Sequence, residues 1–531
     1  MLAGCAGGDG TPTPTSTPGD GDDDGTATPS DGTETPGDIG RELPSDLAEP
    51  GTRDEYLQRA NLVLNVEAPW IFLNRQYSVY GKSTRVNWTA RADETIKGYA
   101  IEPTDGNAVT ITQSQMDSGL DPHDHRETPT QNIVTQTYEG LLGRDADGRI
   151  VNELATGYER SGDAEVTFEL RSGVSFHSGD SFTAEDAAYS INRIVQSDVG
   201  GLESPQSDQL AGVTGAEAGS DSTVVVSTDG FNPTVFALFA SYCDIVNQSW
   251  MESNDAAYIN SHMNGTGPFQ LETYEQDVQV VYSSYGDYWR DAAPADELTI
   301  QAAGEASTRV NQLLSDETDI IVNVPPQSIS QVQGADNAEI AATASTRVIY
   351  NAMVYNAEPF DSVEFRQAMN YAVDMESIVE NILSGFADVT SQPTLENFTG
   401  YNSDVDPYPY DPDQAEALVE ASGYSGAEIT LHTPVGRYLQ DVEIAQAVAG
   451  YIDELPNVSA EVQQRDFGNL AGELLDGDIT TGPDFYLIGW GNTTFDASQT
   501  IIPLLTTDGA LTSYSNEQVD ELINTAQSRI E

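Results

Sequence analysis

The sequence predicts an α/β fold with more than one domain, and three observations support this. At 531 residues the chain is long enough for two or three hydrophobic cores. Residues 165–170 alternate polar and apolar side chains, as a half-buried strand requires. A helix is then predicted over 184–195, because Thr183 stands at the N-cap position with Asp186 three residues on and apolar residues follow at helical spacing. Helical patterns such as that over 365–383 alternate along the chain with short strand patterns such as that over 223–227.

The composition is strongly acidic, with a formal net charge of −65 at pH 7. Lys82 and Lys97 are the only lysines. Such a charge repels nucleic acid and anionic lipid, so neither is an expected partner. The acidic residues are spread through the whole chain, which is typical of proteins adapted to high salt, where screening weakens self-repulsion. We therefore expect a halophilic source and loosening of the fold at low salt.

The N-terminal region predicts an extracellular, lipid-anchored protein. Residues 2–5 read Leu-Ala-Gly-Cys, similar to the site at which a bacterial signal peptide is cut and Cys5 is lipidated. The charged and apolar segments that precede such a site are missing, so either the start codon is placed too late or the match is due to chance. Residues 1–40 are interpreted as a lipidation-site remnant followed by a disordered Thr/Pro/Asp/Gly tether. The other cysteine, Cys243, is predicted to be a small buried residue.

Several segments, taken in order, resemble the dipeptide/oligopeptide/nickel class of extracytoplasmic solute-binding proteins, which serve ABC importers. The segments that carry the resemblance are 109–112, 119–123, 138–142, 144–195, 265–269, 287–289, 365–374 and 410–424. The family implies a two-lobed periplasmic-binding-protein fold, class II-like, with hinge-connected lobes around a ligand cleft. It also implies reversible binding of a peptide-like or other small polar solute, delivery to permease subunits with their ATPase, and no cofactor.

One part of the resemblance is out of order. Residues 53–103 resemble the C-terminal end of family members, yet here they precede the usual beginning. We therefore interpret the chain as circularly permuted, which is tolerated where termini fall in exposed loops. A gene-model error, a chimera and a domain-swapped dimer remain alternatives. On this interpretation residues 77–303 form lobe I, and residues 304–531 form lobe II together with a permuted segment over 41–76. The chain would cross between lobes near 74–77 and 298–303.

The resemblance also nominates ligand-binding residues. In the segment 489–496, an aromatic wall is expected at Trp490; a half-buried core role is the alternative for this side chain. Arg437 matches a position that holds a ligand carboxylate, although it could instead pair with one of the many acids. The full set of predicted ligand-binding residues is Trp490, Gly491, Asn492, Thr493, Asp496, Arg437, Tyr138, Leu120 and Asp121.

Thr493 departs from the family pattern. Peptide binders of this family carry an Asp at that position, which pairs with the ammonium group of the ligand, and a hydroxyl cannot supply that charge. Asp496 is a possible substitute, but it aligns better with a structural Asp. An ordinary peptide with a free amine is therefore in doubt, and sugars or modified peptides stay open.

Other functions have weaker support. His123 and His125 lack an identifiable third metal ligand, so neither a metal site nor a cofactor is expected. No nucleophile motif such as Gly-x-Ser-x-Gly occurs, which leaves a secreted hydrolase as a remote alternative. A surface ligand sensor without transport cannot be separated from an importer component by sequence. The sequence favours a monomeric, non-enzymatic binding lipoprotein.

Overall fold

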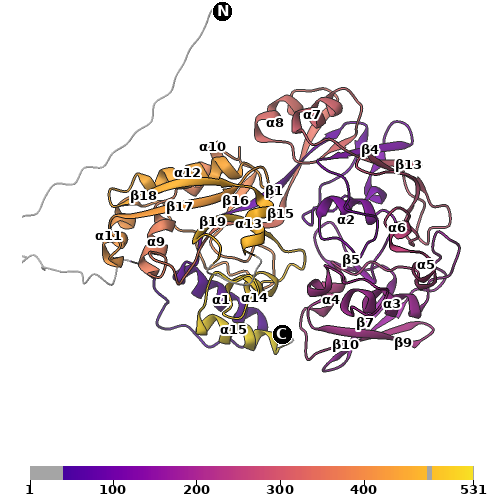
Figure 1. The fold of residues 1–531 in the computed structure, drawn as a ribbon, viewed down its shortest axis with the longest axis horizontal. Helices are drawn as coiled ribbons and strands as arrows, with labels where there is room; N and C mark the ends of the chain where they lie inside the picture. The colour runs from indigo at the N-terminus through magenta and orange to yellow at the C-terminus, as the bar shows by residue number, and fades with distance from the viewer. Residues whose placement is uncertain (1–39, 475–480, 530–531) are drawn as a thin grey trace, which may run out of the picture. The chain divides into compact units, whose positions relative to one another are not determined.

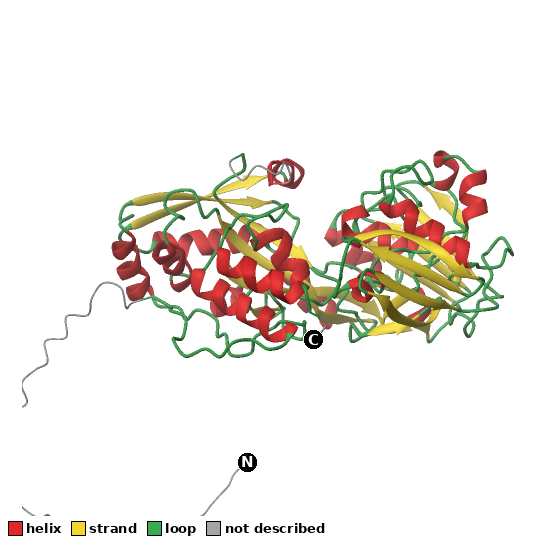
Figure 2. Cartoon of the chain, turned by 90° about the horizontal axis from the view of Figure 1, so that it is seen from below, coloured by secondary structure: helices red, strands yellow, loops and turns green. Residues whose placement is uncertain are grey.

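The structure is a computed structural model that describes residues 40–474 and 481–529. Cys5 and the predicted tether up to residue 39 lie outside the described residues. From Ile39 onward the chain forms one compact unit. Helices and strands are interspersed throughout it (Figure 2), which confirms the α/β class. None of the helices in the described part is both long and apolar enough to cross a bilayer.

An 11-stranded sheet runs through the unit, in the order β11-β12-β13-β4-β14-β1-β15-β19-β17-β18, with β16 on β1. Its strands are β1 (Trp70–Ser83), β4 (Ala108–Gln113), β11 (Phe269–Glu275), β12 (Gln279–Ser284), β13 (Glu297–Ala302), β14 (Ile320–Ile321), β15 (Ala338–Met353), β16 (Ala387–Val389), β17 (Ala427–Pro434), β18 (Val458–Arg465) and β19 (Phe485–Gly491). A separate four-stranded antiparallel sheet contains β7 (Ala155–Gly162), β8 (Glu165–Leu170), β10 (Thr223–Thr228) and β9 (Val213–Ser220). Two short hairpins pair β2 (Val86–Asn87) with β3 (Glu102–Pro103), and β5 (Leu142–Arg144) with β6 (Ile150–Asn152).

The strands β1 and β15 connect the two lobes. They pair antiparallel from Trp70↔Ala352 to Ser83↔Ala338. One half of this ribbon joins β19, β17 and β18, and the other half joins β14 and β4 (Figure 1). Register shifts occur between Phe72 and Asn74 and between Arg75 and Tyr77. The first predicted crossing, near 74–77, therefore coincides with an irregular stretch of β1.

The lobe that contains β19, β17 and β18 (lobe II) has a core on each face of its sheet. Side chains alternate along β1, so Ile71 and Leu73 enter one core while Trp70 and Phe72 enter the other. The helices of this lobe are α1 (Arg53–Glu67), α9 (Val363–Tyr371), α10 (Met375–Asn381), α11 (Pro412–Ser422), α12 (Asp441–Asp453), α13 (Phe467–Leu474), α14 (Ser498–Leu505) and α15 (Glu517–Gln527).

The first and last of these helices, α1 and α15, share the second core (Figure 1). Leu57 and Leu64 of α1 pack in the same cluster as Val519 and Ile523 of α15. The segment predicted to complete lobe II is therefore integrated into the packing of that lobe.

The other lobe (lobe I) contains the predicted strand and capped helix. The strand over 165–170 is β8, with Val166 and Phe168 buried. The helix is α3 (Ala184–Val195), with Thr183 as N-cap and a capping box to Asp186. The remaining helices are α2 (Thr128–Val134), α4 (Val235–Phe239), α5 (Gln248–Ser253), α6 (Ala256–Ile259), α7 (Ala306–Leu314), α8 (Pro326–Gln333) and the short 3₁₀ turns η1 (Gly98–Ala100) and η2 (Ser207–Leu210).

Residues 304–337 do not follow the predicted division into lobes. β13 and β14 both pair parallel with β4, and α7 lies between them in sequence, so they form a strand–helix–strand unit that stays on one sheet. Ile321 and Leu313 share a core with Val79. The second crossing consequently lies in β15, and not near 298–303, because β13 is paired on both edges within lobe I.

Candidate functional site

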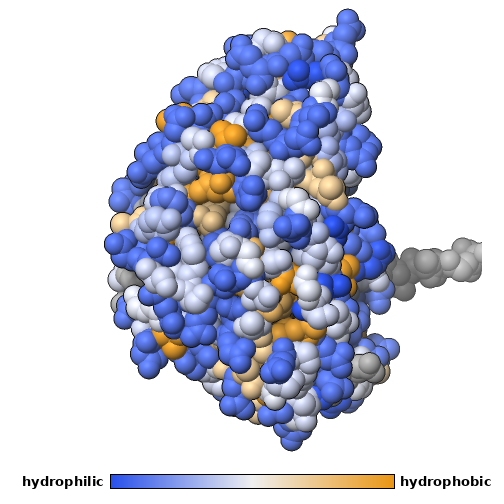
Figure 3. Space-filling view, turned by 90° about the vertical axis from the view of Figure 1, so that its right-hand side faces the viewer, coloured by the Kyte–Doolittle hydropathy of each residue, from blue (hydrophilic) through white to orange (hydrophobic). Residues whose placement is uncertain are grey.

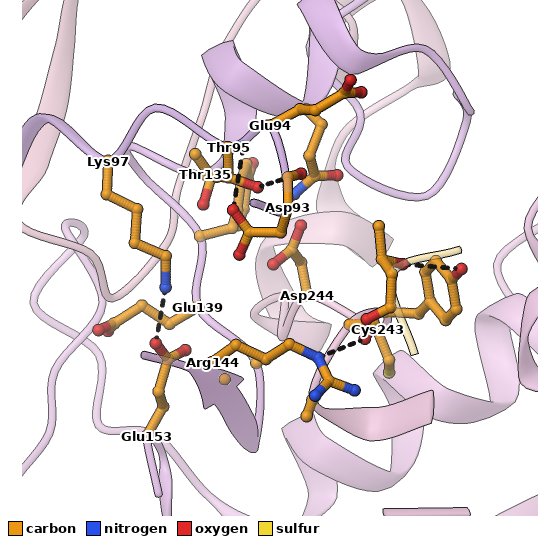
Figure 4. Close-up of a pocket in the computed structure, with 18 of the residues that line it drawn as sticks. Asp93, Glu94, Thr95, Lys97, Thr135, Glu139, Arg144, Glu153, Cys243 and Asp244 are labelled. Carbon is orange, nitrogen blue, oxygen red and sulfur yellow. Dashed lines mark hydrogen bonds and ion pairs between the residues drawn. The ribbon is translucent and has the colours of Figure 1, made fainter. Parts of the chain in front are cut away.

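A polar cavity of about 280 Å³ is lined by residues of both lobes. Figure 4 labels residues of its lobe I wall. Lobe II contributes Thr346 and Arg347 from β15, Gly491 from β19, and Thr493 from the loop that follows. Lobe I contributes the remainder of the wall, mainly from residues 91–99, 125–144 and 240–244. Ligand sites of binding proteins occur in such concave regions between lobes. This cavity is therefore the candidate binding site.

Most charged groups of the wall are paired with each other. Lys97 Nζ donates to Glu153 Oε1 at 2.9 Å, and Arg347 Nη2 donates to Glu94 Oε2 at 3.2 Å. Arg91 forms an ion pair with Asp93. Arg126 pairs with Asp208 at 3.1 Å, and the Arg290 guanidinium lies 3.9 Å from Glu153. These pairs preorganise the wall, and each cancels charge that would otherwise be left for a ligand.

Glu139 is a buried acid in this wall, and its carboxylate accepts hydrogen bonds from neutral donors. Its Oε1 accepts from the Tyr288 hydroxyl, and its Oε2 accepts from Trp289 Nε1 and Thr266 Oγ1, all at 2.8 Å. Burial raises the pKa of Glu139, and the negative charge of Glu153 adds to this rise. The Glu139 carboxylate therefore binds a proton more readily than an exposed glutamate does.

Arg144 is positioned by a tight hairpin. The β5–β6 turn over 145–148 is closed by the Asp145 carboxylate, which accepts from the backbone N–H groups of Asp147 and Arg149. Gly148 has φ 82°, a left-handed conformation that glycine adopts without strain. A Cβ at this glycine would also meet the Phe495 ring at 2.6 Å. The Gly148 carbonyl accepts from Arg144 Nη1 at 2.6 Å, which fixes the guanidinium in the wall.

Three hydrogen bonds join the two lobes beside this guanidinium. Arg144 Nη2 donates to the Thr494 carbonyl at 2.9 Å, and Ser241 Oγ donates to the Thr493 carbonyl at 2.8 Å. Thr493 Oγ1 donates to the Tyr242 hydroxyl at 3.0 Å. Thr493, which departs from the family pattern, therefore contacts lobe I directly in this structure.

Among the predicted ligand-binding residues, Tyr138, Gly491 and Thr493 line the cavity. The Tyr138 hydroxyl accepts from the backbone N–H of Asn264 at 3.2 Å. Burial raises the pKa of this hydroxyl well above its usual range. These three stay predicted ligand contacts, and the cavity brings them together from both lobes.

Three other predicted residues of the 490–496 segment lie outside the cavity wall. Trp490 is half-buried and donates through Nε1 to the Gln499 carbonyl at 3.2 Å. The Asn492 amide donates to the Asp496 carbonyl at 2.8 Å, which holds the turn. The Asp496 carboxylate accepts from both terminal nitrogens of Arg53, at 2.7 and 2.9 Å. The Asp496 carboxylate is therefore engaged in an ion pair outside the cavity wall, and its contact with a ligand ammonium stays a prediction.

The remaining predicted residues also lie away from the cavity wall. Arg437 is exposed on the loop after β17, and its guanidinium lies 5.0 Å from the Phe467 ring. Leu120 is fully buried in a lobe I core. Asp121 binds Arg193 through both of its oxygens, with the Oδ1 contact at 2.9 Å. Burial alone would raise the pKa of Asp121, but the hydrogen bonds and charge of Arg193 outweigh it and lower the pKa. Leu120 therefore packs in a core, Asp121 holds Arg193 in an ion pair, and neither lines the cavity.

The sequence interpretation missed Lys97, Glu139, Arg144 and Asp244. A usable signal existed for Lys97, because lysine is nearly absent from the chain. His125, dismissed as a metal ligand, also lines the cavity, and both of its ring nitrogens lack a hydrogen-bond partner among the described residues. Burial lowers the pKa of His125 to about 4, so the ring is neutral at neutral pH. Its neighbour His123 is instead hydrogen-bonded to the Asp244 carbonyl at 2.7 Å.

Known proteins resemble this chain over most of its length. The glutathione-binding protein GsiB of Pectobacterium atrosepticum is 27% identical over 424 residues, which cover 76% of this chain and 79% of that protein. The solved structure of the ABC transporter-associated periplasmic binding protein DppA from Helicobacter pylori, in complex with the peptide STSA, matches with a TM-score of 0.65. At 19% identity it covers 80% of this chain and 87% of that one. HbpA2 from Haemophilus parasuis matches with a TM-score of 0.67 at 20% identity, covering 80% and 89%.

Residues 149–511, about two-thirds of the chain, match the family described as bacterial extracellular solute-binding proteins, family 5. The two solved structures share the two-lobed fold, and the cavity lies where the lobes meet. The chain belongs to the family 5 bacterial extracellular solute-binding proteins.

Proposed function

We propose that this protein captures a peptide-like or other small polar solute in the cavity between its lobes and delivers it to an ABC permease with its ATPase. The observation that carries the proposal is the charged cavity lined from both lobes. A ligand in that position contacts both lobes, so it binds the closed arrangement more tightly than an open one. The permease can then distinguish the liganded from the empty protein. Binding is reversible, and no bond is made or broken.

A thermal-shift screen in molar salt tests this function. Dipeptides, short oligopeptides, glutathione and oligosaccharides would each be added to the purified protein. A ligand that binds only the native state raises the melting temperature. At a ligand concentration of a hundred times the dissociation constant, the free energy of unfolding increases by about 2.7 kcal/mol. Hydrolysis of these compounds without any ligand-dependent stabilisation would instead favour an enzyme. Import by cells that carry the neighbouring permease genes separates transport from sensing.

The circular permutation stays a proposal, supported by the packing of α1 on α15. Arg529 Nη1 donates to the Gly51 carbonyl at 2.7 Å, so the start of α1 lies beside the end of α15. The alignment with GsiB leaves about a fifth of each protein unmatched, as a changed segment order does. A variant with the segments in the family order would begin at Asn107, run to the C-terminal end, and continue through a short linker into residues 51–106. It should fold and bind as the parent chain does. A stable swapped dimer in light scattering would contradict both the permutation and the predicted monomer.

We also propose that the protein is anchored outside the cell through a lipid on Cys5 and that it is adapted to high salt. The net charge of −65 supports adaptation to salt. The face seen in Figure 3 is mostly hydrophilic. Mass spectrometry of protein from native membranes tests the lipid. A melt that is unchanged between dilute buffer and molar salt would count against the salt adaptation.

A further inference from the structure

Three charged groups of the cavity wall, Arg144, Asp244 and Glu139, have no ion-pair partner of opposite charge among the described residues. Among the described residues, the other basic side chains of the wall each lie within 4 Å of a carboxylate. Arg144 and Asp244 do not take part in any such pair. They lie on the same cavity in Figure 4, Arg144 at the end of β5 and Asp244 in the segment 241–244. Because both oxygens of Glu139 already accept hydrogen bonds, the cavity offers one positive group, Arg144, and one negative group, Asp244, to a ligand.

Arg144 is a buried guanidinium held by neutral acceptors alone. Ser241 Oγ accepts from Nε at 3.1 Å, and the Ala237 and Thr494 carbonyls accept from Nη2. With the bond from Nη1 to Gly148, four of the five guanidinium N–H groups are used. One Nη1 N–H remains, and the positive charge is not neutralised. A buried charge without a counter-charge is costly, so a carboxylate brought by a ligand fits this position.

Asp244 is the corresponding negative group. The Gln131 side chain is a hydrogen-bond donor to its carboxylate, and a carboxylate has room for more donors. Its neighbour Cys243 has φ 75°, a conformation that is strained for a residue other than glycine and that occurs preferentially at functional sites. Burial, followed by the negative charge of Glu153, raises the pKa of Asp244 to about 6. A cation at Asp244 would relieve this unfavourable environment.

Glu139 is the alternative to Asp244 as the partner of a ligand ammonium group. Both of its oxygens already accept strong hydrogen bonds, from Tyr288, Trp289 and Thr266. A ligand ammonium would have to displace at least one of these donors. Asp244 needs no such displacement and is the better partner.

Resting on the proposed function, we infer that the ligand is a small zwitterion whose ammonium group binds Asp244 and whose carboxylate binds Arg144. The carboxylate that peptide binders of the family place at residue 493 is thus replaced by one from lobe I. The cavity volume of about 280 Å³ lies at the lower end for ligand pockets, which favours an amino-acid derivative or a dipeptide over a long peptide. Thr493 then serves lobe contact and not ammonium recognition.

The inference is tested by blocking one ligand charge at a time. Free amino acids and dipeptides, the N-acetylated and C-amidated form of each, and neutral oligosaccharides would be titrated into the full chain in molar salt. We expect the free forms to bind at least about tenfold more tightly than either blocked form, because each block removes a charge-assisted contact. Equal binding of blocked or neutral compounds would overturn the zwitterion but leave the proposed function standing. Binding of none of these compounds would overturn both.

Variants assign each charge to its partner. Asp244→Asn should abolish the preference for the free over the N-acetylated form, and Arg144→Lys should reduce the preference for the free over the amidated form. Lysine is chosen because it keeps the positive charge, although its single ammonium cannot make all four hydrogen bonds of the guanidinium. If both variants kept the parent preferences, the assignment would be wrong.

Matched controls come from outside the cavity. Asp117 accepts from the Tyr274 hydroxyl at 2.7 Å and, like Asp244, has a neutral donor. Arg309 resembles Arg144, since its guanidinium is buried and donates to carbonyls, including that of Ala303 at 2.7 Å. Asp117→Asn and Arg309→Lys should leave both ligand preferences unchanged.

Discussion

The loop over 490–496 and the lobe I wall around Arg144 and Asp244 use their polar groups in opposite ways. In the loop, the Asn492 amide closes a turn and Asp496 binds Arg53. In the wall, Arg144 and Asp244 form no ion pair within 4 Å among the described residues, although the charges of Asp93 and Lys97 act on them from farther away. The loop was nominated by resemblance, while the wall is identified by its unpaired charges. A polar segment that matches a family motif can therefore be scaffold, and the groups left unpaired in a cavity are the better guide to ligand contact.

Removal of Asp496 should give the largest effect on stability. Arg53 and Asp496 form a buried ion pair with both side chains 8% exposed. Asp496→Ala leaves the guanidinium buried and unpaired, which costs about 3–5 kcal/mol. Chemical denaturation in molar salt measures this loss. Ligand affinity of the folded fraction should stay unchanged, because the pair lies outside the cavity wall.

A matched double substitution checks this interpretation. Arg53→Met combined with Asp496→Leu removes both charges and should recover much of the stability lost in the single variant. A weakened ligand affinity in Asp496→Ala, with little change in unfolding, would restore Asp496 to the binding site and remove the contrast between the two regions.

The wall should instead respond to pH. In the ligand-free protein the pKa of Asp244 is raised to about 6, and a bound ammonium group favours the ionised form of its carboxylate. Affinity for a free-amine dipeptide should therefore rise with pH up to about 6 and level off above it, falling by about tenfold per pH unit well below 6. Calorimetric titrations across pH 4.5–8 measure this. The charged groups that act on Asp244 in the structure are Glu153 and Lys97, and the His123 ring contacts its carbonyl.

Asp244→Asn should remove this pH dependence, and a dependence that persists would assign it to another group. The stability of the ligand-free protein should change with pH in the opposite direction to the affinity. An acid whose pKa is raised in the folded state binds its proton more tightly there than in the unfolded chain. Without ligand, Asp244 therefore makes the protein less stable as pH rises between its usual pKa, near 4, and about 6.

Substitution of Thr493 should have a moderate effect on stability and affinity, because we expect this residue to serve only the contact between the lobes. Its hydroxyl donates to Tyr242 across the two lobes. Thr493→Val keeps the shape and removes this bond, which is worth about 0.5–1.5 kcal/mol. We expect a small loss of stability and an equal loss for zwitterionic and blocked ligands. Loss confined to free-amine ligands would show that residue 493 recognises the ammonium group after all.

Sequence reasoning reached the α/β class, the strand over 165–170, the Thr183 cap and the family, because each depends on local patterns or ordered motifs. The second crossing was misplaced because β14 has only two residues and gives no periodic signal. The unpaired charges could not be predicted. The neutrality of a cavity depends on which of many acids lie within 4 Å of each cation, and that is set by packing between segments far apart in sequence.

The smallest effect on ligand affinity is expected at Arg437, the residue that the sequence nominates for the role that we assign to Arg144. The match to a carboxylate-binding position predicts that Arg437→Ala weakens a carboxylate ligand by about 1 kcal/mol or more. The structure places this side chain on an exposed loop, against Phe467 and outside the cavity wall. Exposed substitutions change little, so we now expect less than about 0.5 kcal/mol in affinity. Titration of one dipeptide and its amide into Arg437→Ala and Arg144→Lys decides between the two arginines. A larger loss at Arg437 would mean that the loop after β17 moves into the cavity when ligand binds, and the carboxylate would then belong to lobe II.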